Sequence, residues 1–105
     1  MKPEFENIPL IHDEKAHRFE LTFNGFTCYI QYKKVGAIWS LDETKAPDEL
    51  IGTGAAKALV EKVFAKIRDE NQKIYPVCSY LSHIVQRNPE WKSIVDSSFP
   101  EYEKL

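Results

Sequence analysis

Two features of the sequence carry residue types that could do chemistry, and the first is a run of small residues. Gly52, Gly54 and Ala56 stand at every second position, just ahead of a segment with helical periodicity. Small side chains leave the backbone N–H groups of such a turn uncovered. Because the first N–H groups of a helix have no partner inside it and the helix dipole adds partial positive charge, this turn favours a phosphate or pyrophosphate.

A tight turn with close packing of helix against strand is the alternative interpretation of the same residues. Glycine serves that purpose without any ligand, because it adopts conformations that other residues avoid. Lys57 follows directly and has two interpretations as well. Its ammonium group could add charge to a bound phosphate, or it could be a solvated residue in the first turn of the helix.

The second feature is a thiol at the end of a predicted strand. Residues 74–78, Ile-Tyr-Pro-Val-Cys, have the pattern of a strand that ends in Cys78. The start of a neighbouring helix favours the thiolate, which is the nucleophilic form. Cys78 could therefore attack a thioester and become acylated, or its thiol could protonate a departing sulfur. The alternative is a small, buried hydrophobic residue, which is the commonest role of a free cysteine.

The elements that must position these residues begin with an antiparallel meander. Apolar and polar residues alternate on both sides of Asn24-Gly25, a pair typical of a two-residue type I′ turn. The pattern predicts a hairpin over 18–32, a second turn at 33–36, a third strand over 37–41 and a short edge strand near 8–12.

A crossover unit follows the meander. Apolar residues recur at helical spacing from Leu59 to Ile67, and a strand is predicted over 73–78. A second helix is expected from Tyr80 until Asn88, which we expect to cap a last short helix. The fold class is therefore α+β (mixed α/β): an antiparallel strand meander followed by strand, loop, helix, strand and helix. Both chemical features fall where strands end and helices begin, the usual place for a ligand.

Composition limits the classes of function. The chain has 105 residues, 43% of them hydrophobic and 29% charged, which predicts one domain over 1–105 with loose ends at 1–7 and 97–105. A net charge of −2 and scattered lysines argue against a nucleic-acid partner. Two cysteines and three separated histidines form neither a disulfide framework nor a metal-binding spacing. With no membrane-spanning run and no apolar leader, we expect a cytoplasmic protein.

In the order and spacing of several segments, the chain resembles the GNAT acetyltransferase superfamily, and in particular its short single-domain members. The matching segments cover most of the chain: Gly25 to Tyr32, Leu41 to Pro47, Gly52 to Ala56, Pro76 to Tyr80 and Asn88 to Trp91. Three positions depart from the family pattern. Ile51 stands where the superfamily usually has Arg or Gln, and Glu43 and Asn88 stand where the short members show His.

This resemblance implies that the chain binds acetyl-CoA. The pyrophosphate is expected on the amides from Gly52 to Ala56, the pantetheine arm along the strand with Leu41 to Glu43, and the thioester near Cys78. The cofactor-binding residues implied in this way are Leu41, Asp42, Thr44, Gly52, Thr53, Gly54, Ala55, Ala56, Lys57 and Tyr80. Tyr80 stands where the superfamily often has a tyrosine that protonates the leaving thiolate, although packing alone also explains it.

The expected function is that of an N-acetyltransferase-like protein that passes an acetyl group from acetyl-CoA to an amine. Cys78 and Glu43 are its predicted catalytic residues. Glu43 could accept a proton from the incoming ammonium group, or it could be an idle carboxylate at a strand end. The alternative function is a CoA-binding or protein-interaction module without turnover, because the N-terminal helices that wall the acceptor site of larger relatives are missing. A redox-sensing thiol protein is a third possibility, which no CxxC spacing supports.

Overall fold

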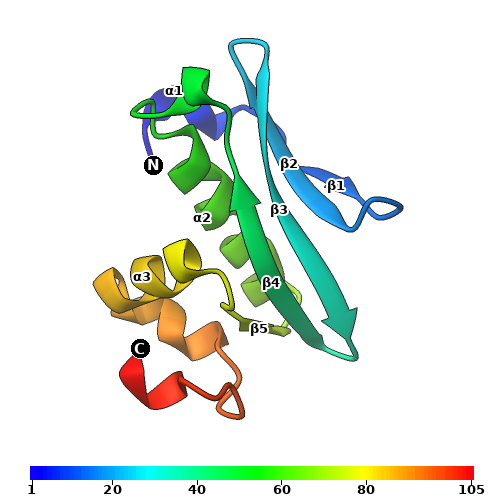
Figure 1. The fold of residues 1–105 in the computed structure, drawn as a ribbon, viewed down its shortest axis with the longest axis vertical. Coiled ribbons are helices and arrows are strands. Elements are labelled where there is room, and N and C mark those ends of the chain that lie inside the picture. The colour runs from blue at the N-terminus through cyan, green and yellow to red at the C-terminus, as the bar shows by residue number, and fades with distance from the viewer.

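The computed structural model describes all 105 residues and contains one five-stranded sheet in the order β1-β2-β3-β4-β5. The strands are β1 (Ile11–Asp13), β2 (Arg18–Phe23), β3 (Phe26–Val35), β4 (Ile38–Lys45) and β5 (Lys73–Tyr75). The first four form an antiparallel meander, and β5 joins β4 in parallel after a crossover through the long helix α2 (Ala55–Asp69; Figure 1). The predicted α+β class is confirmed.

The β2–β3 hairpin is as the sequence predicts. Asn24 and Gly25 have φ angles of 53° and 81°, and Phe23 pairs with Phe26 across the turn, as a type I′ turn requires. The next turn is shorter than the predicted 33–36, because β3 continues to Val35 and only the residues after it turn. Lysines at 33 and 34 do not end the strand, since this end of the hairpin is exposed and charged side chains reach water from it.

Strand β4 runs four residues beyond the predicted end at Leu41, and it contains a bulge. Tyr32 pairs with Leu41 whereas its neighbour Gln31 pairs with Glu43, so Asp42 is an extra residue without a partner. Leu41 and Thr44 consequently face the helices, and Glu43 faces the opposite side of the sheet. The alternating pattern on which the sequence prediction rests is broken at this bulge.

Strand β5 is shorter than the predicted 73–78. It pairs with β4 only from Lys73 to Tyr75, and Pro76 has no N–H group with which to continue the ladder. Beyond that point, the Cys78 N–H donates one hydrogen bond of 3.1 Å to the Leu41 carbonyl. Strand β4 stays beside the start of the next helix, α3 (Ser79–Arg87), as far as Thr44, whose hydroxyl group contacts Cys78.

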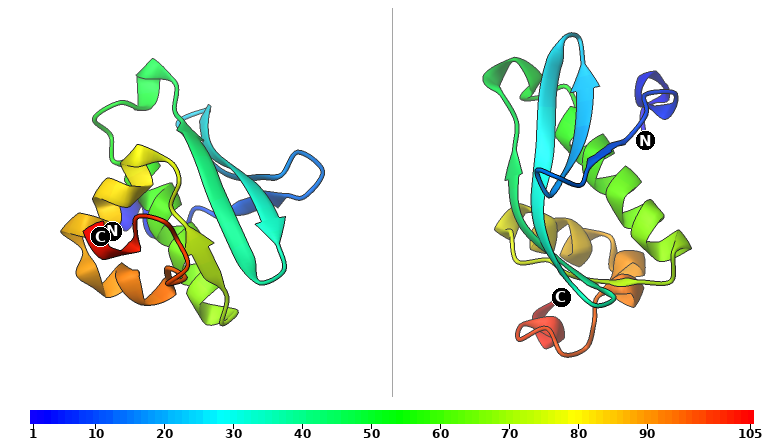
Figure 2. Two further views of the ribbon diagram at one scale, coloured as in Figure 1. Left: turned by 60° about the horizontal axis from the view of Figure 1, so that its bottom comes forward. Right: turned by 90° about the vertical axis from the view of Figure 1, so that its right-hand side faces the viewer.

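The helices cover one face of the sheet and leave the other face open (Figure 2). Helix α2 buries its apolar side on β2 and β3, and α3 packs beside the 3₁₀ helix η2 (Pro89–Ile94). The remaining helical segments are short: α1 (Pro3–Glu6), η1 (Asp48–Leu50) and η3 (Tyr102–Lys104). None of the helices combines the length and the apolar character that crossing a bilayer requires.

Asn88 does not cap η2 with its side chain, contrary to the prediction. Its amide nitrogen donates to the carbonyl of Ile84 at 2.8 Å, so the side chain closes the end of α3 instead. Proline at position 89 still separates the two helices as predicted, because the residue before a proline avoids helical geometry.

The two ends of the chain pack on the core, which differs from the predicted loose ends. Phe5 is only 1% exposed and belongs to a core of 22 buried residues, all of them hydrophobic. At the other end, Phe99, Tyr102 and Leu105 pack against the same core. Single apolar residues within a polar segment give no periodic signal, so the sequence pattern cannot show that they find a place at the edge of the core.

Candidate functional site

The small-residue loop, residues 51–57, presents unpaired backbone N–H groups at the start of α2. Gly52 and Gly54 have φ angles of 80° and 90°, in the left-handed region that glycine adopts without strain. The N–H groups of Gly52, Gly54, Ala56 and Lys57 have no hydrogen-bond partner in the protein. Four donors on one turn, together with the positive end of a helix of 15 residues, are an arrangement that favours an anion.

Thr53 and Ala55 instead hold the shape of the loop. The Thr53 hydroxyl donates to the Leu50 carbonyl at 2.7 Å and accepts the Ala55 N–H at 3.1 Å. Ala55 is fully buried. These two residues were among the predicted binding residues, and their polar groups are engaged within the loop itself.

Lys2 brings a positive charge to the small-residue loop, and the sequence analysis missed it. Its Nζ atom donates to the Thr53 carbonyl at 3.1 Å and lies 3.5 Å from where a Cβ atom on Gly54 would be. The lysine is 51 positions away from its partner, so no local spacing could have revealed the contact. Lys57 adds a second, exposed lysine beside it.

A cavity of about 430 Å³ connects the small-residue loop to α3. Ala46 after β4, Lys2 and Tyr80 line it together with the glycines of the loop. Burial raises the pKa of Tyr80, so its phenol group keeps its proton at neutral pH and can donate it to a hydrogen bond. The structure therefore brings Tyr80 to the same cavity as the predicted phosphate-binding amides.

Cys78 is half-buried between α3 and β4. Its Sγ atom lies 3.6 Å from the Thr44 hydroxyl oxygen, to which the thiol donates, and its own N–H holds the Leu41 carbonyl. The first two N–H groups of α3, those of Ser79 and Tyr80, have no partner in the protein. The positive end of this helix therefore lies next to the residue that carries the sulfur.

The acidic residues of β4 lie apart from this sulfur. Glu43 is on the open face, pairs with Lys45 at 3.1 Å and has a side chain that is 51% exposed. Asp42, at the bulge, accepts a hydrogen bond from Ser40 at 2.6 Å and lies 3.6 Å from the ammonium group of Lys33. The structure thus groups Leu41 and Thr44 with Cys78 and places the carboxylates on the other side of the strand.

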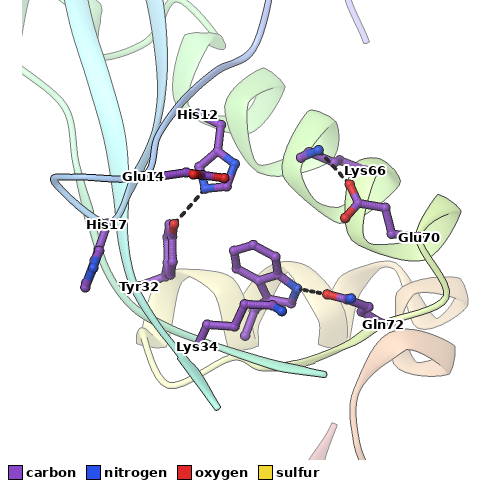
Figure 3. Close-up of a pocket in the computed structure, with 9 residues that line it drawn as sticks. His12, Glu14, His17, Tyr32, Lys34, Lys66, Glu70 and Gln72 are labelled. Carbon is purple, nitrogen blue, oxygen red and sulfur yellow. Dashed lines mark hydrogen bonds and ion pairs between the residues drawn. The ribbon is translucent and has the colours of Figure 1, made fainter. Parts of the chain in front are cut away.

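A further cavity of about 450 Å³ lies at the other end of α2, and none of the predicted site residues line it (Figure 3). His12 Nε2 and the Tyr32 hydroxyl are 2.6 Å apart there, and the Trp39 Nε1–H donates to Gln72 at 2.5 Å. Burial lowers the pKa of His12, so the imidazole favours its neutral form. No sequence pattern reveals this cluster, because its members come from separate strands and from the segment after α2.

Comparison with known proteins agrees with this geometry. Residues 18–94 match the family model of the GCN5-related N-acetyl-transferases. A GCN5-like protein from Staphylococcus aureus, solved in solution by NMR, superposes with a TM-score of 0.65 and 25% sequence identity, over 87% of this chain and 90% of that chain. No curated protein matches the sequence. The matched residues include β2 to η2 and leave out both ends, and with them Lys2.

Proposed function

Because the chain belongs to the GCN5-related N-acetyltransferase family, we propose that it binds acetyl-CoA and transfers the acetyl group to an amine. The observation that carries this proposal is the set of four unpaired N–H groups in the small-residue loop, whose residues line a cavity together with Tyr80 of α3. A phosphate group is the natural ligand of such a turn.

In this proposal the small-residue loop holds the pyrophosphate. The backbone N–H groups donate to its oxygens, and the ammonium groups of Lys2 and Lys57 balance part of its charge. Absent side chains at 52 and 54 leave room for the phosphates to approach the backbone. The departure at Ile51 does not affect this cradle, since the cradle consists of main-chain groups.

The pantetheine arm would lie in the gap that opens where β4 and β5 stop pairing. Pairing between them ends at Ser40 and Tyr75, and the strand residues that follow, from Leu41 to Thr44, are beside Cys78. The Leu41 carbonyl is already occupied by the Cys78 N–H, so this carbonyl helps to fix the position of the sulfur. This course of the arm leads from the small-residue loop to the thiol.

Transfer removes two protons from the amine nitrogen and supplies one to the departing sulfur. The acceptor ammonium group must lose a proton before its nitrogen attacks the acetyl carbon, and the carbon–sulfur bond then breaks. The departing sulfur takes a proton from the Cys78 thiol or the Tyr80 phenol, so that an amide, free CoA and one released proton result. Glu43 on the open face is the proposed proton acceptor for an amine that arrives from that side.

A covalent route through Cys78 is the other way to the same products. The thiolate would attack the acetyl carbon, release CoA and carry the acetyl group until the amine takes it. The unpaired amides of Ser79 and Tyr80 support this role, because free N–H groups beside the nucleophile can donate to negative charge that develops during transfer.

Calorimetry with CoA and acetyl-CoA tests the proposal directly. We expect saturable binding, and the absence of any heat at millimolar ligand would end the proposal. Mass spectrometry after incubation with acetyl-CoA then separates the two routes. An acetyl adduct that disappears in Cys78→Ala supports the covalent route, whereas acetylated amine without an adduct supports direct transfer.

A CoA-binding module without turnover is the second candidate. It is favoured by one observation: the Glu43 carboxylate is paired with Lys45. The face of the sheet on which it lies is not covered by helices (Figure 2). Tight binding of CoA, with neither an adduct nor any acetylated amine in a screen of amines, would support this candidate over the transferase.

A further inference from the structure

The largest cavity of the molecule, about 700 Å³, lies beside Cys78 on the side away from the small-residue loop. We call it the tail cavity, because the C-terminal segment closes it through Phe99, Pro100 and Glu101. Val77 and Ser79 line it as well, and they are the chain neighbours of Cys78 on either side. Consecutive Cα atoms are about 3.8 Å apart, so the lining comes within one residue of Cys78 on either side, although Cys78 itself does not line the cavity.

The first turns of α3 separate the tail cavity from the cavity of the small-residue loop. Tyr80 lines the loop cavity, whereas Ser79, Ser82 and His83 line the tail cavity. The spacing explains the division, because residues three and four positions apart share one face of a helix and the neighbour at 80 does not. Cys78 stands at the start of this helix, directly between two residues that line the tail cavity, and its sulfur contacts Thr44 of β4.

Tyr75 connects the tail cavity to the open face of the sheet. Its neighbour Ile74 is fully buried toward the helices, so Tyr75 points to the opposite face by the alternation of a strand. Glu43, the proposed proton acceptor, also lies on the open face. A molecule in the tail cavity would therefore approach the end of β5 from the same side as Glu43.

The lining of the tail cavity favours a cation with an apolar body. The rings of Tyr75 and Phe99 have centroids 5.5 Å apart and offer an apolar wall. Glu101 contributes a carboxylate that has no hydrogen bond in the protein, and His83 has an imidazole without a partner. No lysine or arginine lines the cavity. An ammonium group can therefore be paired there, whereas a carboxylate or phosphate group would find no counterion.

We propose that the tail cavity is the acceptor site and that it takes primary amines with a single apolar or aromatic arm, bound as ammonium ions. This inference rests on the proposed function and names its substrate class. The tail cavity binds and orients the amine. The amide bond then forms and the carbon–sulfur bond of the thioester breaks. Residues 99–101 lie outside the segment that matches the family, so this selectivity belongs to the tail of this chain.

Amide NMR spectra of the full chain, recorded with phenethylamine and without CoA, test the binding. We expect shifts that saturate at the N–H groups of Val77, Ser79 and His83. Glu101→Gln should weaken binding about fivefold, the effect of losing one partly exposed charge pair. Glu103→Gln is the matched control, because it removes the same charge two residues away and does not line the cavity.

Two related probes sharpen the test. Phenylpropionate has a similar aromatic arm with a negative charge, and it should leave the three amides unshifted. Ethanolamine has the positive charge without the arm, and it should bind more weakly than phenethylamine. Shifts confined to other parts of the protein, or equal affinities for the two glutamate variants, would overturn the proposal.

Turnover separates a failure of this inference from a failure of the proposed function. If CoA binds and phenethylamine is acetylated, Glu101→Gln should raise KM about fivefold and leave kcat nearly unchanged. An unchanged KM would refute the acceptor site while the transferase stands. Failure of CoA to bind would instead remove the transferase itself, and calorimetry detects that without any amine.

Discussion

The sulfur of Cys78 donates a hydrogen bond to the hydroxyl group of Thr44, with 3.6 Å between Sγ and Oγ1. This contact joins the start of α3 to the inward face of β4, at the point where the two parallel strands of the crossover unit have stopped pairing. It places a thiol at one end of the proposed course of the pantetheine arm, and the small-residue loop is at the other end.

Replacing Gly52 by aspartate should abolish measurable CoA binding. Its carboxylate would repel the phosphates and could itself accept hydrogen bonds from the free N–H groups of the loop. Gly25→Asp is a close control, since the φ angles of the two glycines are 80° and 81° and neither would crowd a Cβ atom. Calorimetry with both folded variants decides: comparable CoA affinities would exclude the small-residue loop as the anion site.

Removing the charge of Lys2 should weaken CoA binding about fivefold and make it less dependent on salt. Lys2→Met keeps the length of the side chain and loses the ammonium group beside the Thr53 carbonyl. A partly exposed charge contributes about 1 kcal/mol, and salt screens this contribution. Lys15→Met, in the exposed turn after β1, should have no effect. CoA titrations at low and high salt check this. Equal CoA affinities and equal salt dependence for Lys2→Met and Lys15→Met would contradict the prediction.

Only one of the two cysteines should react quickly with a thiol reagent in the folded protein. Cys28 is 0% exposed, and burial raises the pKa of its thiol, so it should stay unmodified. Cys78 is half-buried and should react. Peptide mapping after brief treatment with iodoacetamide measures both sites. Bound CoA should slow the modification of Cys78, and faster labelling of Cys28 would contradict the assignment.

Stability should fall when the pH drops below the ordinary pKa of histidine, because of His12. Burial lowers the pKa of His12 from its usual 6.5, so the unfolded chain binds a proton at a pH where the folded protein does not. The stability that neutral His12 contributes is fully present above pH 6.5. It is lost as the pH falls through the lowered pKa that His12 has in the folded protein. Urea unfolding between pH 7 and pH 5 measures the free energy of unfolding. This free energy should change less with pH in His12→Gln than in the parent protein, while His83→Gln, which alters an exposed residue, should change it as the parent does.

The sequence predicted the elements whose signals are local. Asn24-Gly25 predicts the hairpin turn because its two positive φ angles suit only a few residue types. The helical spacing of apolar residues predicts α2. The small-residue loop was found for the same reason. These elements agree with the family and the fold that the comparisons support.

What the sequence could not show depends on contacts between distant residues. The bulge at Asp42 comes from the pairing of β3 with β4, and no property of aspartate marks it. Lys2 reaches the small-residue loop, and Phe99 helps to close the tail cavity, only because the ends of the chain pack on the core. Both ends are polar on average, so their composition predicted loose segments instead.

The extra residue in β4 decides which side chain meets the sulfur. In a regular ladder Glu43 would point toward the helices and Thr44 away from them, so a carboxylate would sit against Cys78. Its negative charge would oppose ionisation of the thiol and would have to be buried. The same residues paired without the bulge would keep every functional group, yet they would present the sulfur with an anion in place of an alcohol.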